Sequence, residues 1–114
     1  MIITGTRKGV TGPAYGELLR RLSKLPRGTV VVDGGANGVD RQARSIAQGI
    51  GHMTETHMAN WLKFGRTAGP IRNQIMIEKG ADLVIAFPSE TSKGTRDMIK
   101  RAEAAGIPVE VHEV

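Results

Sequence analysis

The feature that most constrains the fold of this chain is the stretch from Val30 to Asp40, which reads Val-Val-Val-Asp-Gly-Gly-Ala-Asn-Gly-Val-Asp. Three consecutive β-branched residues are typical of a strand that is buried on both faces. The glycines that follow allow a tight turn and a close approach of a ligand to the backbone. A helix is expected from Val39, so its free N–H groups would face the turn, as they do in phosphate sites. The stretch therefore predicts a strand, a turn and a helix around an anion site.

Strand and helix patterns alternate along the rest of the chain. We expect strands over residues 2–4, 29–32, 53–58, 81–87 and 109–111, and loops over 60–66 and 88–95. Helices are expected to open at Gly12-Pro13, Val39, Pro70 and Thr95. This order predicts an α/β fold, a Rossmann-like three-layer sandwich with a mostly parallel sheet, in one domain over residues 1–114. The loops that leave the strand ends should meet at one edge of the sheet, where ligands of such folds bind.

The composition narrows the classes of partner. Sixteen basic and eleven acidic residues give a net charge of +5, which favours phosphates, nucleotides or nucleic acid. The chain has no cysteine, and its three histidines do not have metal-ligand spacing, so no metal and no cofactor are predicted. No apolar run is long enough to span a bilayer and no signal peptide is recognised, so we expect no membrane partner and a cytoplasmic location.

The glycine turn supplies the first set of candidate ligand-binding residues: Gly34, Gly35, Ala36, Gly38, Val39 and Asp40. Its glycine spacing matches neither the dinucleotide fingerprint nor the P-loop. A plain strand-to-helix turn would explain one or two of the glycines, but it explains three glycines and a polar Asn37 less well. Asp40 would either cap the helix, which we rank first, or bind a ribose hydroxyl.

A second anion site of the same design is expected at Gly94 and Thr95, where a helix follows a polar loop. Helix capping by Ser92 or Thr95 is the alternative for that motif. Arg7, Arg72 and Arg96 would each either bind phosphate or carry surface charge. Trp61, the one tryptophan of the chain, would either stack on a base or pack against the protein.

Taken together, these motifs resemble those of a known family. They are Gly5-Thr6-Arg7, residues 34–40, Trp61, Ala68-Gly69-Pro70-Ile71-Arg72-Asn73 with Met76, Ala86-Phe87-Pro88, and Gly94-Thr95-Arg96-Asp97. In this order they resemble the YspA/YpsA-related branch of the SLOG superfamily, which includes DprA (Smf) and the LOG proteins. The resemblance covers nearly the whole chain and suits small phage-encoded or bacterial members. It implies a Rossmann-like domain that binds nucleotide-derived ligands, with Gly5, Thr6, Asn73 and Pro88 added to the site.

LOG enzymes cleave the N-glycosidic bond of nucleoside monophosphates. Their phosphate loop resembles Gly94-Thr95 here, and the arginine of an earlier helix is matched by Arg72, which would be the catalytic residue. Met98 stands where the family has its glutamate.

Three functions follow, in order of preference: a sensor or sequestering module for a nucleotide-derived ligand, a LOG-like N-glycosidase, and DprA-like binding of single-stranded DNA. The first needs only the two phosphate-type loops, the second needs a catalytic carboxylate as well, and the third draws on the positive charge. Because many Rossmann-like proteins of this size pair through helices, a homodimer is also expected.

Overall fold

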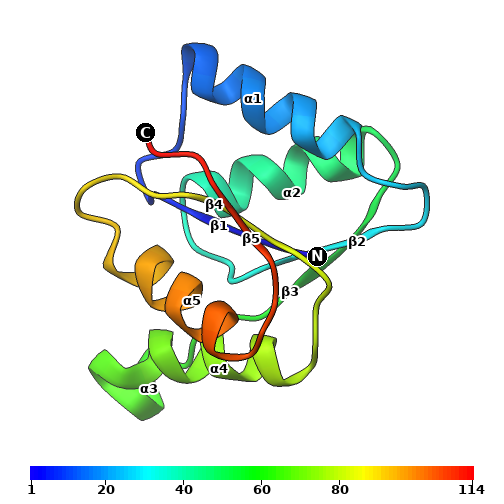
Figure 1. Ribbon diagram of the computed structural model, residues 1–114. Helices are drawn as coiled ribbons and strands as arrows, with labels where there is room; N and C mark the ends of the chain where they lie inside the picture. Colours follow the sequence, from blue (N-terminus) through cyan, green and yellow to red (C-terminus); the bar gives the residue numbers. More distant parts are fainter.

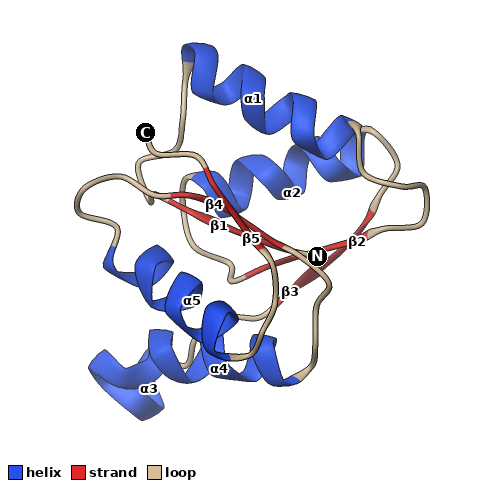
Figure 2. Ribbon diagram, in the orientation of Figure 1, coloured by secondary structure: helices blue, strands red, loops and turns tan.

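Five parallel strands form one sheet in the order β3-β2-β1-β4-β5 (Figures 1 and 2). The computed structural model describes residues 1–114. The strands are β1 (Ile2–Gly5), β2 (Val30–Asp33), β3 (Met53–Thr56), β4 (Val84–Phe87) and β5 (Val109–Val111). Each has only three or four residues, so the sheet is short along its strands.

Helices cover both faces of the sheet and complete the predicted three-layer sandwich. In Figure 2, α1 (Gly12–Ser23) and α2 (Val39–Gly49) lie on one side, and α4 (Ala68–Glu78) and α5 (Lys93–Ala104) lie on the other. A one-turn helix, α3 (Trp61–Phe64), and a short 3-10 helix, η1 (Gly65–Thr67), precede α4. The α/β prediction is therefore confirmed.

The core consists of two apolar clusters, one on each face of the sheet. Ile3, Ile85 and Phe87 pack with residues of α1 and α2, whereas Ile2 and Val84 pack with residues of α4 and α5. Neighbouring strand residues point to opposite faces, so the apolar pairs in β1 and β4 serve both clusters. All four residues of β4 are buried, as expected for a central parallel strand.

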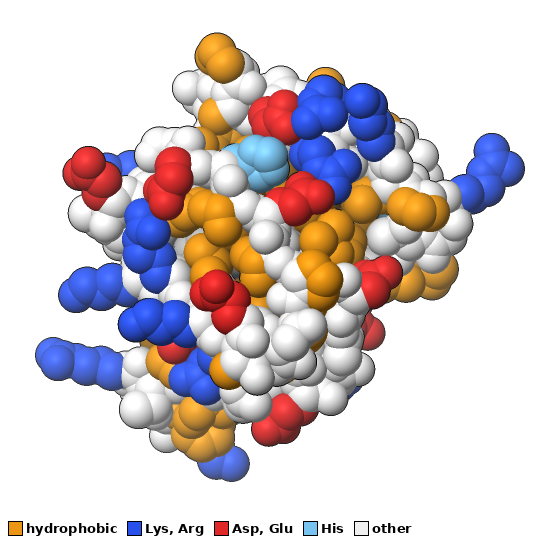
Figure 3. Space-filling view, viewed as in Figure 1, with side chains coloured by type: hydrophobic (Ala, Val, Ile, Leu, Met, Phe, Trp, Pro, Cys, Tyr) orange, Lys and Arg blue, Asp and Glu red, His pale blue; other side chains and the backbone are white.

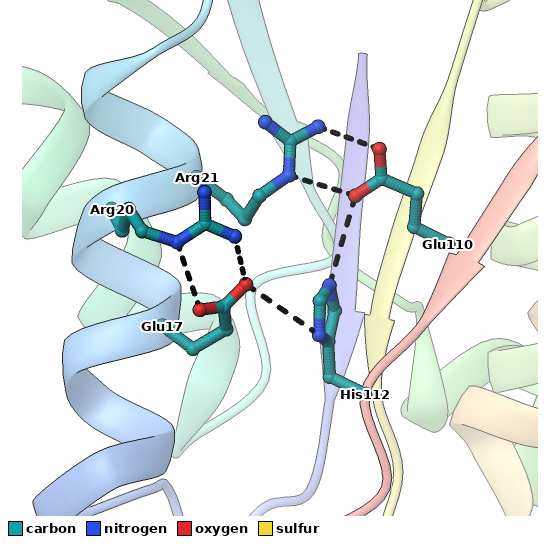
Figure 4. A network of polar contacts seen from close by, with 5 residues as sticks. All are labelled: Glu17, Arg20, Arg21, Glu110 and His112. Atoms are coloured by element: carbon teal, nitrogen blue, oxygen red, sulfur yellow. Dashed lines mark hydrogen bonds and ion pairs between the residues drawn. The ribbon is translucent and has the colours of Figure 1, made fainter.

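A network of charged side chains joins α1 to the edge strand β5 (Figure 4). Arg21 donates to both carboxylate oxygens of Glu110, at 2.8 and 2.6 Å. The His112 ring stacks on Phe87 with centroids 4.8 Å apart, and its nitrogens lie 3.9 Å from Glu17 and 3.7 Å from Glu110. The network therefore holds the chain's last strand against its first helix.

Two segments depart from the predicted elements. Residues 60–66 were expected to form a loop, but they contain α3, because the Asn60 side chain accepts the N–H of Lys63 at 3.1 Å and caps a single turn. The prediction that Pro70 opens a helix is also wrong. The helix begins at Ala68, and Pro70 is its third residue, where an intrahelical N–H bond is not yet needed.

The remaining differences concern element ends. α5 begins at Lys93 rather than Thr95, β3 ends at Thr56 rather than at residue 58, and β4 starts at Val84 rather than at residue 81. None of the helices has both the length and the apolar composition needed to cross a lipid bilayer.

Candidate functional site

The carboxyl ends of β1 and β4 flank the point where strand order reverses, and a cavity of about 400 Å³ lies there. We call it the first cavity. The loops after β1, β2 and β4 all contribute to its wall, so the predicted convergence of these loops is confirmed. Helices α4 and α5 add Arg72, Asn73, Met76 and Met98, and the remaining wall comes from β1 and from Asp40 of α2.

The N-terminus of α5 opens onto the first cavity. The amide N–H groups of Gly94 and Thr95 donate no hydrogen bond within the protein, because they belong to the first turn of the helix. The Thr95 side chain is only 4% exposed, yet its hydroxyl also has no protein partner. These three donors, at the positive end of a twelve-residue helix, form a suitable place for an anion.

Arg72 faces the same cavity and is held by its neighbours. Its Nε donates to the side-chain oxygen of Asn73 at 2.9 Å, and its Nη1 donates to the carbonyl oxygen of Gly34. A Cβ atom on Gly34 would collide with the guanidinium, so this glycine provides the room for Arg72. Nη2 has no partner in the protein, which leaves one edge of a fixed cation for a ligand. Burial lowers the pKa of Arg72 from its usual value, while the Asp40 carboxylate opposes that change.

Asn73 connects Arg72 to the α5 N-terminus. Its side-chain nitrogen donates to the carbonyl oxygen of Gly94 at 3.2 Å and to Asp97 at 3.0 Å, while its oxygen accepts from Arg72. The sequence predicted Asn73 as a ligand-binding residue, and it does line the first cavity. Because its polar atoms are used by the protein, its role in the structure is to hold two helices in register.

The glycine turn differs from its prediction, because its amides are already engaged. Gly34 and Ala36 donate to Asp40 Oδ2 at 3.0 and 3.2 Å, and Gly35 donates to Asp33 Oδ1 at 2.7 Å. The protein's own carboxylates thus occupy the place that we had expected a phosphate to take. These three amides therefore have partners within the protein, and their binding of a ligand stays a prediction that would require those hydrogen bonds to be exchanged.

Asp40 is not a helix cap either. The N-cap of α2 is Gly38, and Asp40 is the second helical residue, whose carboxylate reaches back to the turn. Desolvation in this buried position raises the pKa of Asp40 to about 6, although the amides of Ala36 and Gly34 favour its charged form. The side chain is 4% exposed and lines the first cavity, and its Oδ1 accepts no hydrogen bond from the protein. This oxygen is available to accept a ligand hydroxyl, the alternative role that the sequence left open.

A second cavity, of about 210 Å³, adjoins the first. The two share Arg7, Gly34, Ala36 and Arg72 as lining residues. Trp61, which is 49% exposed, lines the second cavity, and the guanidinium carbon of Arg7 lies 5.8 Å from its ring centroid. The structure therefore brings Trp61, Arg7 and the glycine turn together.

Four of the predicted residues line neither cavity: Gly38, Val39, Pro88 and Arg96. Val39 and Pro88 are buried, and Gly38 adopts a φ of 78° that places it against the Thr6 carbonyl. Arg96 instead donates to the carbonyl oxygen of Ser89 at 2.9 Å and pairs with Glu113 at 3.2 Å. The other predicted residues, among them Gly5 and Thr6, line one or both cavities.

Sequence reasoning missed two cations of the first cavity, Lys8 and Lys93. With Arg7 and Arg72 they make four cations against the single carboxylate of Asp40. Figure 3 shows Lys and Arg side chains gathered along the edge of the molecule that carries the start of α5. The sequence did contain a clue, because Lys8 and Lys93 lie in the segments that were expected to form loops after strands. No group of three or more His, Cys, Asp or Glu side chains is placed to hold a metal ion.

Comparison with known proteins identifies a phage relative. No protein family profile matches the chain, and no solved structure matches it. The chain is similar to the Gene 61 protein of Mycobacterium phage D29, with 40% identity over 116 aligned positions that cover 96% of this chain and 92% of that protein. Because the similarity runs through nearly the full length of both chains, this chain belongs to the family of the phage Gene 61 protein.

Proposed function

We propose that the chain binds the phosphate group of a nucleotide-derived ligand in the first cavity and acts as a sensor or sequestering module. The observation that carries the proposal is the set of unpartnered donors from two helices around one cavity: the amides of Gly94 and Thr95, the Thr95 hydroxyl and Arg72 Nη2. Four lining cations and one carboxylate make the cavity attractive to anions.

A phosphate at this place would satisfy the donors of α5 and receive a charge-assisted hydrogen bond from Arg72. Asp40 Oδ1 would then accept from a sugar hydroxyl of the same ligand, since an unpartnered carboxylate oxygen can only accept. The resemblance to the SLOG superfamily adds support, because it puts Arg72 and Gly94-Thr95 in the phosphate site.

Calorimetry and thermal-shift measurements with AMP, ribose 5-phosphate, ADP-ribose and cyclic nucleotides test the proposal. A ligand that binds only the native state raises its stability by an amount that grows with concentration. Arg72→Gln and Thr95→Val should each weaken binding about tenfold or more, because each removes a donor to a charged group. Lys100→Gln is the matched control, since it removes an exposed charge of α5 that lines neither cavity. Binding of none of these phosphates would contradict the proposal.

A LOG-like N-glycosidase is the second candidate, and Asp40 is the observation in its favour. A buried carboxyl with a pKa of about 6 can give or take a proton near neutral pH. Met98 lines the cavity where the resemblance expects the glutamate, so Asp40 would have to supply the acid-base chemistry. This candidate predicts release of free base from a nucleoside monophosphate, with loss of activity in Asp40→Asn and Arg72→Gln. Absence of base release from all common mononucleotides would eliminate it.

Binding of single-stranded DNA is the third candidate. Its supporting observation is that both aromatic residues of α3 have a basic partner: Lys63 Nζ lies 5.1 Å from the Phe64 ring centroid, and the Arg7 guanidinium carbon lies 5.8 Å from that of Trp61. Such groups stack on bases and attract the backbone of a single strand. Binding of an oligonucleotide that weakens steeply with salt would support this candidate, and no binding at low salt would remove it.

A further inference from the structure

We propose that the second cavity binds a planar nucleobase of the same ligand, so that the base lies on Trp61 while the phosphate lies at the α5 N-terminus. This inference rests on the proposed function and specifies its ligand. The protein would then recognise a nucleoside phosphate at both ends, and a sugar phosphate without a base would fill only half of the site.

The shared wall of the two cavities is the first line of evidence. Arg7, Gly34, Ala36 and Arg72 line both, so the two cavities adjoin, and in this inference one ligand spans them. Asp40, whose Oδ1 accepts no hydrogen bond from the protein, lines the first cavity and not the second, which suits a sugar hydroxyl near the phosphate. The phosphate and sugar would therefore lie in the first cavity, with Gly94, Thr95 and Asp40, and the base in the second, with Trp61.

The environment of Trp61 is the second line of evidence. Its ring borders α4 closely, since a Cβ atom added to Gly69 would lie 3.3 Å from it, yet 49% of the side chain is exposed. Arg7 lies within cation–π distance of the ring, and the 71%-exposed side chain of Met58 lines the same cavity. The indole ring is held against α4 in a cavity that also contains a cation and a thioether. It therefore offers a stacking surface that loses little conformational freedom when a base binds.

Asn37 supplies the polar group that base recognition needs. It is exposed, it lines the second cavity, and its side-chain amide makes no hydrogen bond within the protein. An amide offers one acceptor and two donors in a plane, which can pair with the edge of a base. The second cavity thus combines a stacking face with a group that can read the edge of the ring.

Trp61 makes the experiment direct, because it is the one tryptophan and its fluorescence reports this cavity alone. The protein is titrated with AMP, GMP, CMP and UMP, and separately with ribose 5-phosphate, which carries the same phosphate without a base. We expect at least one nucleotide to change the Trp61 emission and to bind about tenfold more tightly than ribose 5-phosphate, as base stacking on an aromatic ring predicts. Ribose 5-phosphate should compete for the site and leave the emission unchanged.

Variants separate this inference from the proposed function. In calorimetry, Trp61→Leu should reduce nucleotide affinity about tenfold and leave ribose 5-phosphate affinity unchanged, whereas Trp61→Phe should retain most of the affinity. Leu62→Ala, which truncates the fully exposed neighbour of Trp61, is the matched control and should leave both affinities unchanged.

The outcomes divide clearly. If nucleotides and ribose 5-phosphate bind equally and Trp61→Leu changes neither, the inference is overturned while the proposed function stands. If no phosphate compound binds, both the inference and the proposed function are contradicted. If an oligonucleotide alters the Trp61 emission and mononucleotides do not, Trp61 serves a nucleic acid, which also overturns the inference.

Discussion

The carboxylate of Asp40 accepts the amide N–H of Gly34 at 3.0 Å, across six residues of the chain. Because of this bond, the amide N–H of Gly34 is used within the protein. The glycine turn therefore forms part of the wall of the first cavity, while the free anion donors come from α4 and α5. The bond also fixes a buried carboxyl beside a cavity rich in cations, which makes the protonation of Asp40 relevant to both stability and binding.

Asp40→Asn should change how stability depends on pH. The pKa of Asp40 rises from 3.8 to about 6 on folding, so the native state binds this proton more tightly than the unfolded state. The free energy of unfolding of the wild type should therefore fall as pH rises from about 4 to about 6, by roughly 3 kcal/mol from this group. The variant keeps an oxygen for the Gly34 amide and has no proton to lose, so this decline should disappear.

Urea denaturation of both proteins at several pH values measures the effect. The stability of Asp40→Asn relative to wild type should increase across this pH window and then level off. Glu90→Gln is the control, because Glu90 is exposed, forms no hydrogen bond or ion pair through its side chain, and lines neither cavity. A stability difference for Asp40→Asn that is the same at both ends of the window would contradict the prediction.

Asn73→Ala should weaken both the packing of α4 on α5 and phosphate binding. The substitution removes the hydrogen bonds to Gly94, Asp97 and Arg72 and leaves their polar groups with fewer partners. We expect a loss of about 1–3 kcal/mol in the free energy of unfolding and a lower phosphate affinity, because Arg72 is no longer held. Denaturation and calorimetry on the same preparations measure the two effects.

Gln74→Ala is the neighbouring control for Asn73→Ala. Gln74 contacts Glu78 and Arg101 at the surface and lines neither cavity. Its substitution should cost within about 0.5 kcal/mol and leave ligand affinity unchanged. Equal losses from the two alanine variants would show that Asn73 has no special role at the site.

The parallel sheet and the sheet edge that carries the site followed from local patterns, whereas the strand order did not. The apolar runs at Val30–Val32 and Val84–Phe87 alternate with amphipathic helices, and that alternation requires parallel strands whose loops meet at one edge. α3 escaped prediction because a helix of four residues is much shorter than the window of about 11–18 residues over which helical periodicity is detected. Its stability comes from one side-chain cap at Asn60, which any polar loop could contain.

At the site, the residue types pointed to the lining of the cavities, but the hydrogen-bond partners of these residues could not be predicted from the sequence. A glycine turn looks the same in sequence whether its amides bind a ligand or the carboxylate of Asp40, since that contact depends on the path of the loop. Gly5 was assigned to the ligand through the family resemblance. It lines the first cavity, but a Cβ on it would also lie 2.6 Å from Cβ of Val39, so helix packing alone accounts for this glycine.

The contact between α1 and β5 should make a small and coupled contribution to stability. Arg21→Gln and Glu110→Gln each break the paired hydrogen bonds, and each should cost at most about 1 kcal/mol because both side chains are partly exposed. The double variant should cost little more than either single variant. The hydrogen bonds from Arg21 lower the pKa of Glu110, so this stabilisation should be present above its unfolded pKa and be lost as pH falls through the lowered value. Fully additive losses in urea denaturation would contradict the coupling.

Two glycine substitutions of identical chemistry should have opposite effects on stability. Gly5→Ala places a methyl group against the buried Val39 side chain, where strand and helix have no room to separate, and should cost about 1–3 kcal/mol. Gly16→Ala adds the same methyl at an exposed position of α1 with nothing within 4 Å, and should stabilise by up to about 1 kcal/mol through lower backbone entropy of the unfolded chain. Val39→Ala combined with Gly5→Ala should cost less than the sum of the two single losses, because the smaller side chain makes room for the added methyl. Thermal or urea denaturation measures all four variants, and a neutral Gly5→Ala would show that β1 and α2 are less closely packed than the structure has them.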